Sequence, residues 1–435
     1  PLWTTRKYRY APNRKQNVDS FLSKGALIVF FDYWHFGGFV NKVAPTNMKY
    51  EIQTYDLTSR KIDIQTKKKH LKPIKKHKIT PFIFSKWGLF HGVTKAQLSR
   101  GLTTTIFLQI LLGNVFKFNT IISSKSSKIR LIRGGSKLYK DFSSSTSAGE
   151  ISQGLSILYF ESKGYPFCSH FDDFRRDHKV AKNGESPDFV FEKTPKDRIL
   201  VEAKGSFVAP ETASNLKAPL AKALSQLKSW GVKFSPPLKK SYAFAVLLRE
   251  LEDPFNEESL LAVVDPEETE APNAANVPPS YVRRVNYSNW LQLMGYNELA
   301  TIILSDGEHS RAEHTFFAIS IAGEQYAIIP LIPVQSENTF DVRRQEATPV
   351  DIRYKIFPKL DRFIFVGMRL SVLKELSHLS TRGNLNNITS LETLDQFRDI
   401  ENDDLINGSI FTDGSVIGEA DIHTLDTVNS VRLKF

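Results

Sequence analysis

The chain has 435 residues, of which 41% are hydrophobic and 24% are charged. These fractions are typical of folded globular proteins and exclude a chain that is disordered over most of its length. The single cysteine, Cys168, excludes an intramolecular disulfide and a cysteine-rich zinc site, and it favours a reducing compartment, here the cytoplasm.

The net charge of +11 is concentrated at one end of the chain. Residues 1–140 hold 27 Lys and Arg against 5 Asp and Glu, a net +22, whereas the remaining residues carry −11. A local excess of this size attracts polyanions and makes their binding sensitive to salt. It predicts an N-terminal domain that contacts nucleic acid; a solvated basic surface is the alternative.

This basic domain, residues 1–140, contains candidate strands at 26–31 and 128–133. Its most apolar stretch, residues 106–118, is too short and too polar to span a membrane, so we expect no membrane association. A lysine-rich segment supplies candidate phosphate contacts. Its lysines are Lys67, Lys68, Lys69, Lys72, Lys75 and Lys76.

The second predicted domain, residues 141–250, begins with a helix that is capped near Ser147 and ends at Gly164. Three strands, a leucine-striped helix and a fourth strand follow. Their expected ranges are 165–169, 188–192 and 199–203 for the strands, 215–230 for the helix and 242–248 for the last strand. This order predicts an α/β sandwich in which the second helix is a crossover connection.

Acidic residues and prolines dominate residues 251–280, which predicts a linker or a long surface loop. Residues 281–435 then predict an α+β domain with a helix near 287–304 and a hairpin over 315–331. A further strand pair is expected to turn at Asp413-Gly414. We expect this domain to serve specificity, homodimer formation or contact with a protein partner.

The residues that carry chemistry lie on two consecutive predicted strands. Asp188 opens one strand, and Glu202-Ala203-Lys204 closes the next. Residues two apart in a strand point to the same face, so Glu202 and Lys204 project together, and Asp188 comes alongside if the strands pair. Two converging carboxylates suit Mg²⁺, with Mn²⁺ as a substitute, and a neighbouring lysine can orient water or offset charge on a phosphate.

With these residues, the chain resembles the PD-(D/E)XK, or restriction-endonuclease-like, superfamily over about residues 149–248. The resemblance implies a mixed sheet flanked by helices, between the basic N-terminal domain and the α+β C-terminal domain. It maps Asp188, Glu202 and Lys204 onto the motif. It also makes Glu150 of the first helix a third metal ligand and places Gln226 where several branches carry a glutamine, with Trp230 near the usual aromatic position.

The function implied is a Mg²⁺-dependent DNA endonuclease acting in prokaryotic restriction, phage defence or transposition. The motif residues have a plainer alternative. A Glu-x-Lys pair is commonly a solvated charge pair, and Gln226 lies away from the leucine stripe, on a helix face expected to be solvated. Arg175 and Arg176 lie in an expected loop before Asp188 and are candidate DNA contacts. The alternative functions are a DNA-binding protein with an inactive nuclease-like core and a partner-gated subunit of a larger complex.

Overall fold

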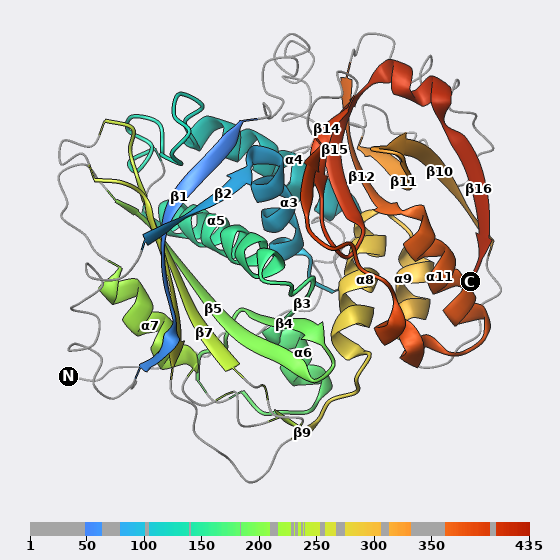
Figure 1. Cartoon of the computed structure of the whole chain (residues 1–435), viewed down its shortest axis with the longest axis horizontal. Coiled ribbons are helices and arrows are strands. Elements are labelled where there is room, and N and C mark those ends of the chain that lie inside the picture. Colours follow the sequence, from blue (N-terminus) through green and yellow to red (C-terminus); the bar gives the residue numbers. More distant parts are fainter. Residues whose placement is uncertain are drawn as a thin grey trace, which may run out of the picture.

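Two seven-stranded sheets lie side by side in the computed structural model of this protein, with helices packed on and between them (Figure 1). The structure describes residues 48–62, 79–100, 104–138, 141–182, 184–208, 216–227, 230, 234–235, 238, 240–252, 257–266, 275–305, 313–331, 362–400 and 406–435. The protein is therefore a mixed α/β protein in which the two sheets have different strand patterns.

The first sheet is curled and mixed, with the order β2-β1-β8-β7-β5-β4-β3. The pairs β1–β8 and β5–β7 are parallel, and the other neighbours are antiparallel. Its central strands are almost wholly apolar and buried, as expected for strands that are covered on both faces. The strands are β1 (Lys49–Ile62), β2 (Ile79–Ser85), β3 (Phe167–His170), β4 (Phe189–Thr194), β5 (Asp197–Val208), β7 (Lys240–Arg249) and β8 (Leu260–Pro266).

Five helices belong to this first unit: α3 (Lys86–Gln97), α4 (Thr104–Ile121), α5 (Asp141–Ser162), α6 (Phe171–Asp177) and α7 (Lys217–Leu227). Helix α5 packs on β5, and α7 packs on β5 and β7. Helices α3 and α5 cross closely at two glycines, because a Cβ at Gly92 would lie 2.5 Å from the carbonyl oxygen of Gly154. A short parallel pair, β6 (Phe234–Ser235) and β9 (Ala275–Asn276), lies apart from both sheets.

The second sheet is entirely antiparallel and has the order β13-β14-β15-β12-β11-β10-β16. Its strands are β10 (Glu313–Ile321), β11 (Glu324–Leu331), β12 (Arg362–Arg369), β13 (Arg398–Ile400), β14 (Ile406–Ile410), β15 (Ser415–Asp421) and β16 (Asn429–Lys434). The accompanying helices are α8 (Tyr281–Leu293), α9 (Asn297–Leu304) and α11 (Leu370–Thr381), with 3-10 turns at Leu385–Ser390 and Ile422–Thr427.

Both turns predicted in this part of the chain are confirmed. The β10–β11 hairpin turns at Ala322 and Gly323, which have φ values of +50° and +82°. The β14–β15 pair turns through Asp413 and Gly414, where φ is +87° at the glycine. Positive φ at these positions is what a tight hairpin requires and what glycine supplies most readily.

The structure corrects several expected boundaries. Residues 260–266 of the expected acidic linker form β8, whose Leu261–Val264 segment is fully buried between β1 and β7. Strands β1 and β2 of the expected N-terminal domain belong to the same sheet as Asp188 and Glu202. The first sheet thus draws strands from both sides of the boundaries expected at 140 and 250, because hydrogen bonding between distant strands leaves no mark in local composition.

Smaller differences have local causes. The expected loop around Arg175 and Arg176 is helix α6, and the expected helix over 287–304 is two helices separated at Gly295, where φ is +81°. The expected strand at 128–133 makes isolated bridges to Glu51 of β1, to Ile122 and to Glu250. Among the described helices, α4 included, none combines the length and apolarity that a membrane crossing needs.

Candidate active site

Asp188 and Glu202 meet where strands β4 and β5 separate. Phe189 and Val201 form the last register pair, and the Asp188 N–H donates to the Val201 carbonyl at 3.2 Å. Two residues further along β5, the Ala203 N–H donates to a side chain instead of to the backbone of β4. Its acceptor is Asp188 Oδ2, at 2.9 Å. The carboxylate therefore lies between the diverging strands, directly beside Glu202.

Glu202 is fully buried, at 0% exposure, although it is an acid. The Lys204 ammonium pairs with its Oε1, as the shared strand face predicts. The Asp188 backbone and the Lys204 ammonium both hydrogen-bond to this carboxylate and favour its charged form. Burial and the adjacent Asp188 raise the pKa of Glu202 to about 8, against the opposing effect of Lys204.

Helix α5 contributes Gln153 to this site. Its Nε2 donates to Asp188 Oδ1 at 2.9 Å, so both oxygens of Asp188 accept one hydrogen bond each. Burial raises the pKa of Asp188, while the Ala203 N–H, Lys204 and Gln153 oppose that rise. Gln153 was not among the residues expected at the site. Its position three residues after Glu150 places it on the same side of the helix and is the feature of the sequence that indicates it.

Close packing of α5 on β5 brings Gln153 within reach. A Cβ at Gly205 would lie 1.8 Å from the carbonyl oxygen of Ala148, so only glycine fits at this contact. Ala148 lies five residues before Gln153 on α5, and Gly205 directly follows Lys204 on β5. The packing of a single glycine thus sets the distance between the helix and the acids.

Glu150, the expected third acid, forms an ion pair with Lys117 of α4. Both side chains are about one-fifth exposed, at 21% and 22%. In the described residues, no three His, Cys, Asp or Glu side chains converge into a metal-binding cluster. The structure therefore brings Asp188, Glu202 and Lys204 together, and it directs the Glu150 carboxylate to Lys117.

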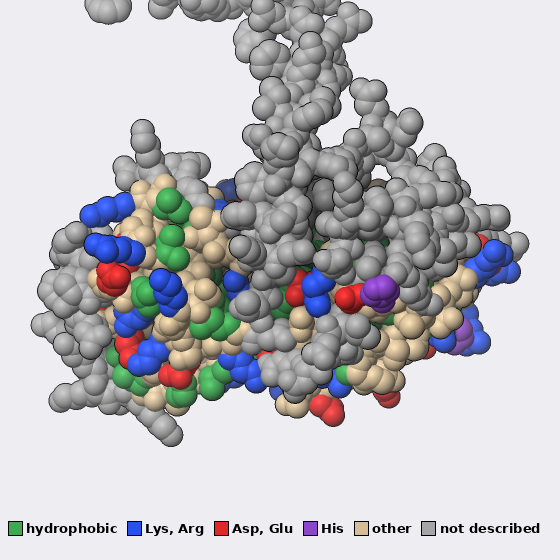
Figure 2. Space-filling view, turned by 90° about the horizontal axis from the view of Figure 1, so that it is seen from above, with side chains coloured by type: hydrophobic (Ala, Val, Ile, Leu, Met, Phe, Trp, Pro, Cys, Tyr) green, Lys and Arg blue, Asp and Glu red, His purple; other side chains and the backbone are tan. Residues whose placement is uncertain are grey.

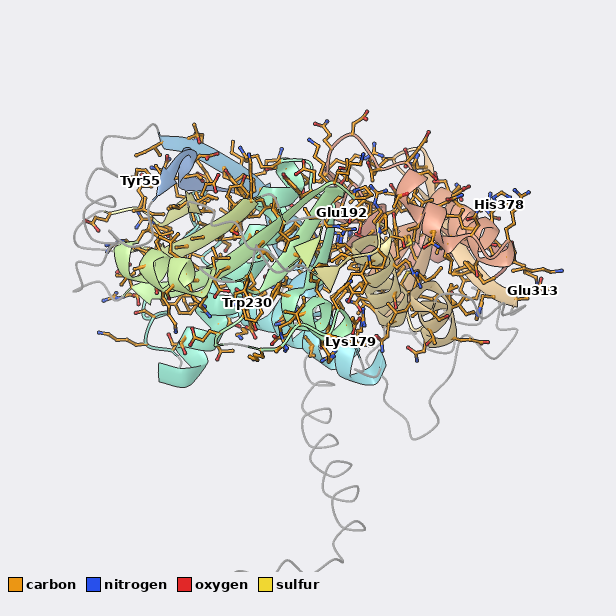
Figure 3. The ribbon with its side chains drawn as sticks, turned by 90° about the horizontal axis from the view of Figure 1, so that it is seen from below. Tyr55, Lys179, Glu192, Trp230, Glu313 and His378 are labelled. Carbon is orange, nitrogen blue, oxygen red and sulfur yellow. The ribbon has the colours of Figure 1, made fainter. Side chains whose placement is uncertain are left out.

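Gln226 of α7 and Trp230, which follows this helix, are both buried, although Gln226 was expected on a solvated face. Gln226 is buried at 9% exposure, and its Oε1 has no hydrogen-bond partner among the described residues. Trp230, labelled in Figure 3, is fully buried. It packs edge-on against Phe171 and donates its indole N–H to the Glu185 carbonyl at 3.0 Å. Trp230 thereby holds the segment that leads into Asp188, a positioning role for a residue expected only as a near match to a motif.

The structure describes two of the predicted DNA contacts, Arg175 and Arg176. Arg175 and Arg176 lie on α6, where each forms an ion pair with the aspartate three residues before it. Arg176 remains largely exposed, at 62%, whereas Arg175 is 16% exposed and also donates to the Val180 carbonyl. The lysines at 67, 68, 69, 72, 75 and 76 lie outside the described residues.

The donor set suits a hard divalent cation. Asp188 and Glu202 supply carboxylate oxygens side by side, and burial next to a second acid disfavours the charged form of Glu202, a penalty that a bound cation would offset. Lys204 alone supplies part of that compensation. A buried acid pair with a raised pKa and a lysine counter-ion is typical of a functional site.

A second polar cluster joins the two sheets. Asp413 accepts from Lys95 at 2.8 Å, from Asn286 at 2.8 Å and from the Ser415 hydroxyl at 2.6 Å. The Ser415 hydroxyl also contacts His91 Nε2 at 3.0 Å.

This cluster contains Ser, His and Asp, but its arrangement is structural. Asp413 contacts the serine rather than the histidine, and all three side chains are 1% exposed or less. The His91 ring stacks on Phe411 with centroids 3.7 Å apart. Burial and nearby Lys95 lower the pKa of His91, with Asp413 opposing, so the ring stays neutral between the sheets.

Other charged groups fix α8 on the first sheet. Glu192 of β4 is fully buried and pairs with Arg198 at 2.7 Å and with Arg283 of α8 at 3.0 Å, at the junction labelled in Figure 3. These charges pair with each other, which leaves the Asp188–Glu202 pair as the candidate for catalysis. Comparison of the chain with models of known families, with curated proteins and with solved structures finds no match, so this assignment rests on the geometry of the chain itself.

Proposed function

We propose that this protein is a Mg²⁺-dependent DNA endonuclease of the PD-(D/E)XK type, with a restriction-endonuclease-like core formed by the first sheet, α5 and α7. One observation carries the proposal: Asp188 and Glu202 lie side by side at the point where two strands diverge, with Lys204 paired to Glu202. Two adjacent acids can hold a divalent cation, and a neighbouring lysine can act on the phosphate or the attacking water, as metal-assisted phosphodiester hydrolysis requires.

Each residue has a defined task in such a reaction. A divalent cation held by Asp188 and Glu202 would act as a Lewis acid on the phosphate and lower the pKa of a bound water. Lys204, with a side chain 23% exposed, reaches solvent and can orient the attacking water or offset charge on the phosphate oxygens. Asp188, held by two hydrogen bonds, gives the cation a fixed oxygen.

DNA as the substrate is supported by the basic first 140 residues. On the described surface seen from above, Lys and Arg side chains lie over the first unit and are interspersed with acids (Figure 2). We infer a role in prokaryotic restriction, phage defence or transposition in the cytoplasm. The C-terminal sheet is then the candidate for specificity, dimer formation or partner contact.

A second function is favoured by one specific observation. Glu150 is engaged by Lys117 and does not join the other two acids, which suits a subunit whose site is completed only in a larger complex. A partner-gated nuclease would bind DNA without its partner but would cut DNA only when the partner is present.

The test is cleavage of supercoiled, linear and single-stranded DNA by the purified chain with Mg²⁺, Mn²⁺ or EDTA. The variants are Asp188→Asn and Lys204→Ala. The matched controls are Asp395→Asn, just before β13, and Lys374→Ala, on α11, which change exposed residues. The proposal is supported if cleavage requires metal and is lost in Asp188→Asn and Lys204→Ala but not in the two controls. Cutting that persists in Asp188→Asn refutes it, and DNA binding without cutting by any form favours the gated subunit.

A further inference from the structure

Gln153 is the side chain by which helix α5 reaches the acid pair. Its amide N–H donates to Asp188 Oδ1 at 2.9 Å, while the Ala203 N–H occupies Oδ2 at the same distance. A carboxylate that accepts one bond on each oxygen has a fixed plane. Its remaining lone pairs then have fixed directions relative to Glu202.

The residue one turn earlier on the same helix does not share this contact. Glu150 pairs with Lys117 of α4, and that pair is partly solvated. An acid whose charge is already matched by a partly exposed lysine gains little by moving into a buried acid pair, where a third negative charge would be repelled. A neutral amide can approach Asp188 without that repulsion, which explains why glutamine rather than glutamate occupies this position.

We propose that Gln153 is a positioning residue of the catalytic site, which holds Asp188 in the orientation required for cation binding. This inference rests on the proposed nuclease function. It assigns to Gln153 the contribution of α5 that the resemblance to PD-(D/E)XK enzymes assigns to Glu150. Partners that orient a metal ligand typically change metal affinity about 10- to 100-fold when removed.

The experiment measures Mn²⁺ affinity by titration calorimetry and the Mg²⁺ concentration for half-maximal cleavage, using the full chain. Gln153→Met keeps the length of the side chain and removes its donor, and Gln153→Asn keeps the amide and removes its reach. Gln97→Met is the matched control, because it removes a side-chain amide bonded to Asn114 at the end of α3. Urea unfolding of each variant shows whether it is folded.

We expect both Gln153 variants to weaken Mn²⁺ binding about 10-fold or more and to raise the half-maximal Mg²⁺ concentration in parallel. Cleavage at saturating Mg²⁺ should largely recover, which a general packing defect would not produce. Glu150→Gln should cause a smaller loss of Mn²⁺ affinity than Gln153→Met.

Two results would overturn the inference. Either the Gln153 variants bind Mn²⁺ like wild type and the Gln97→Met control, or Glu150→Gln loses as much affinity as they do. Both results leave wild-type binding and cleavage intact. Failure of the nuclease proposal is distinct, because wild type itself would then neither bind Mn²⁺ nor cut.

Discussion

The buried Lys95–Asp413 pair gives the sharpest test of how the two sheets depend on each other. The side chains are 3% and 0% exposed, and Lys95 Nζ lies 2.8 Å from Asp413 Oδ2. Lys95→Met preserves most of the apolar stem and leaves Asp413 buried with its Ser415 and Asn286 donors but without a counter-ion. Breaking one partner of a buried ion pair costs about 3–5 kcal/mol, so we expect the free energy of unfolding to fall by that amount.

Asp413→Asn alone should also destabilise, because it leaves the Lys95 ammonium buried. The double variant Lys95→Met with Asp413→Asn removes both charges and should be less destabilised than the sum of the two, by about 2 kcal/mol or more. Urea unfolding followed by circular dichroism and tryptophan fluorescence measures all four forms. A loss below about 1 kcal/mol in Lys95→Met, or strict additivity in the cycle, would refute the reasoning.

Three further predictions concern packing, pH and metal. Gly205→Ala should lower the free energy of unfolding, measured by urea titration, by at least about 1–3 kcal/mol, because its Cβ would overlap the Ala148 carbonyl. Gly149→Ala should not lower it, because a Cβ there meets nothing within 4 Å, and equal losses in the two variants would contradict this prediction. Because the pKa of His91 is lowered in the folded state, its contribution to stability is full above the usual 6.5 and is lost as pH falls below that value. The melting temperature of wild type should therefore fall more steeply from pH 7 to pH 5 than that of His91→Gln. Parallel pH dependences of the two melting temperatures would exclude this contribution of His91. Millimolar Mg²⁺ should raise the melting temperature of wild type but not of Glu202→Gln, and EDTA should reverse the gain; an equal rise in both forms would place the ion elsewhere.

Local sequence patterns predicted the helices and strands around the site but not all of their ends, since α5 begins at Asp141 rather than near Ser147 and β5 continues past Lys204 to Val208. The strand before Glu202 is a run of apolar residues, and the alternation of side chains places Glu202 and Lys204 on one face, where the structure pairs them. The hairpins at Gly323 and Gly414 were also predictable, since a positive φ selects glycine. These features depend on residues only a few positions apart, which is why the sequence predicts them.

Long-range pairing was not predictable in this way. Strand β8 lies in an acidic, proline-bearing region, and only its parallel pairing with β1, about 200 residues earlier, makes it a central strand. The burial of Gln226 likewise depends on neighbours from distant segments. So do the different partners of two α5 residues, since Gln153 contacts Asp188 and Glu150 pairs with Lys117.

The sequence by itself determined which residues carry the acid and ammonium groups of the proposed site and that Glu202 and Lys204 share one strand face. The tertiary structure decided which helix residue reaches the acids, because the approach of α5 is set by the contact between Gly205 and Ala148. It also decided that the two sheets share one buried polar cluster around Asp413. Side-chain periodicity acts within a segment, whereas close packing and buried charge pairing act between segments and appear only when the chain is folded.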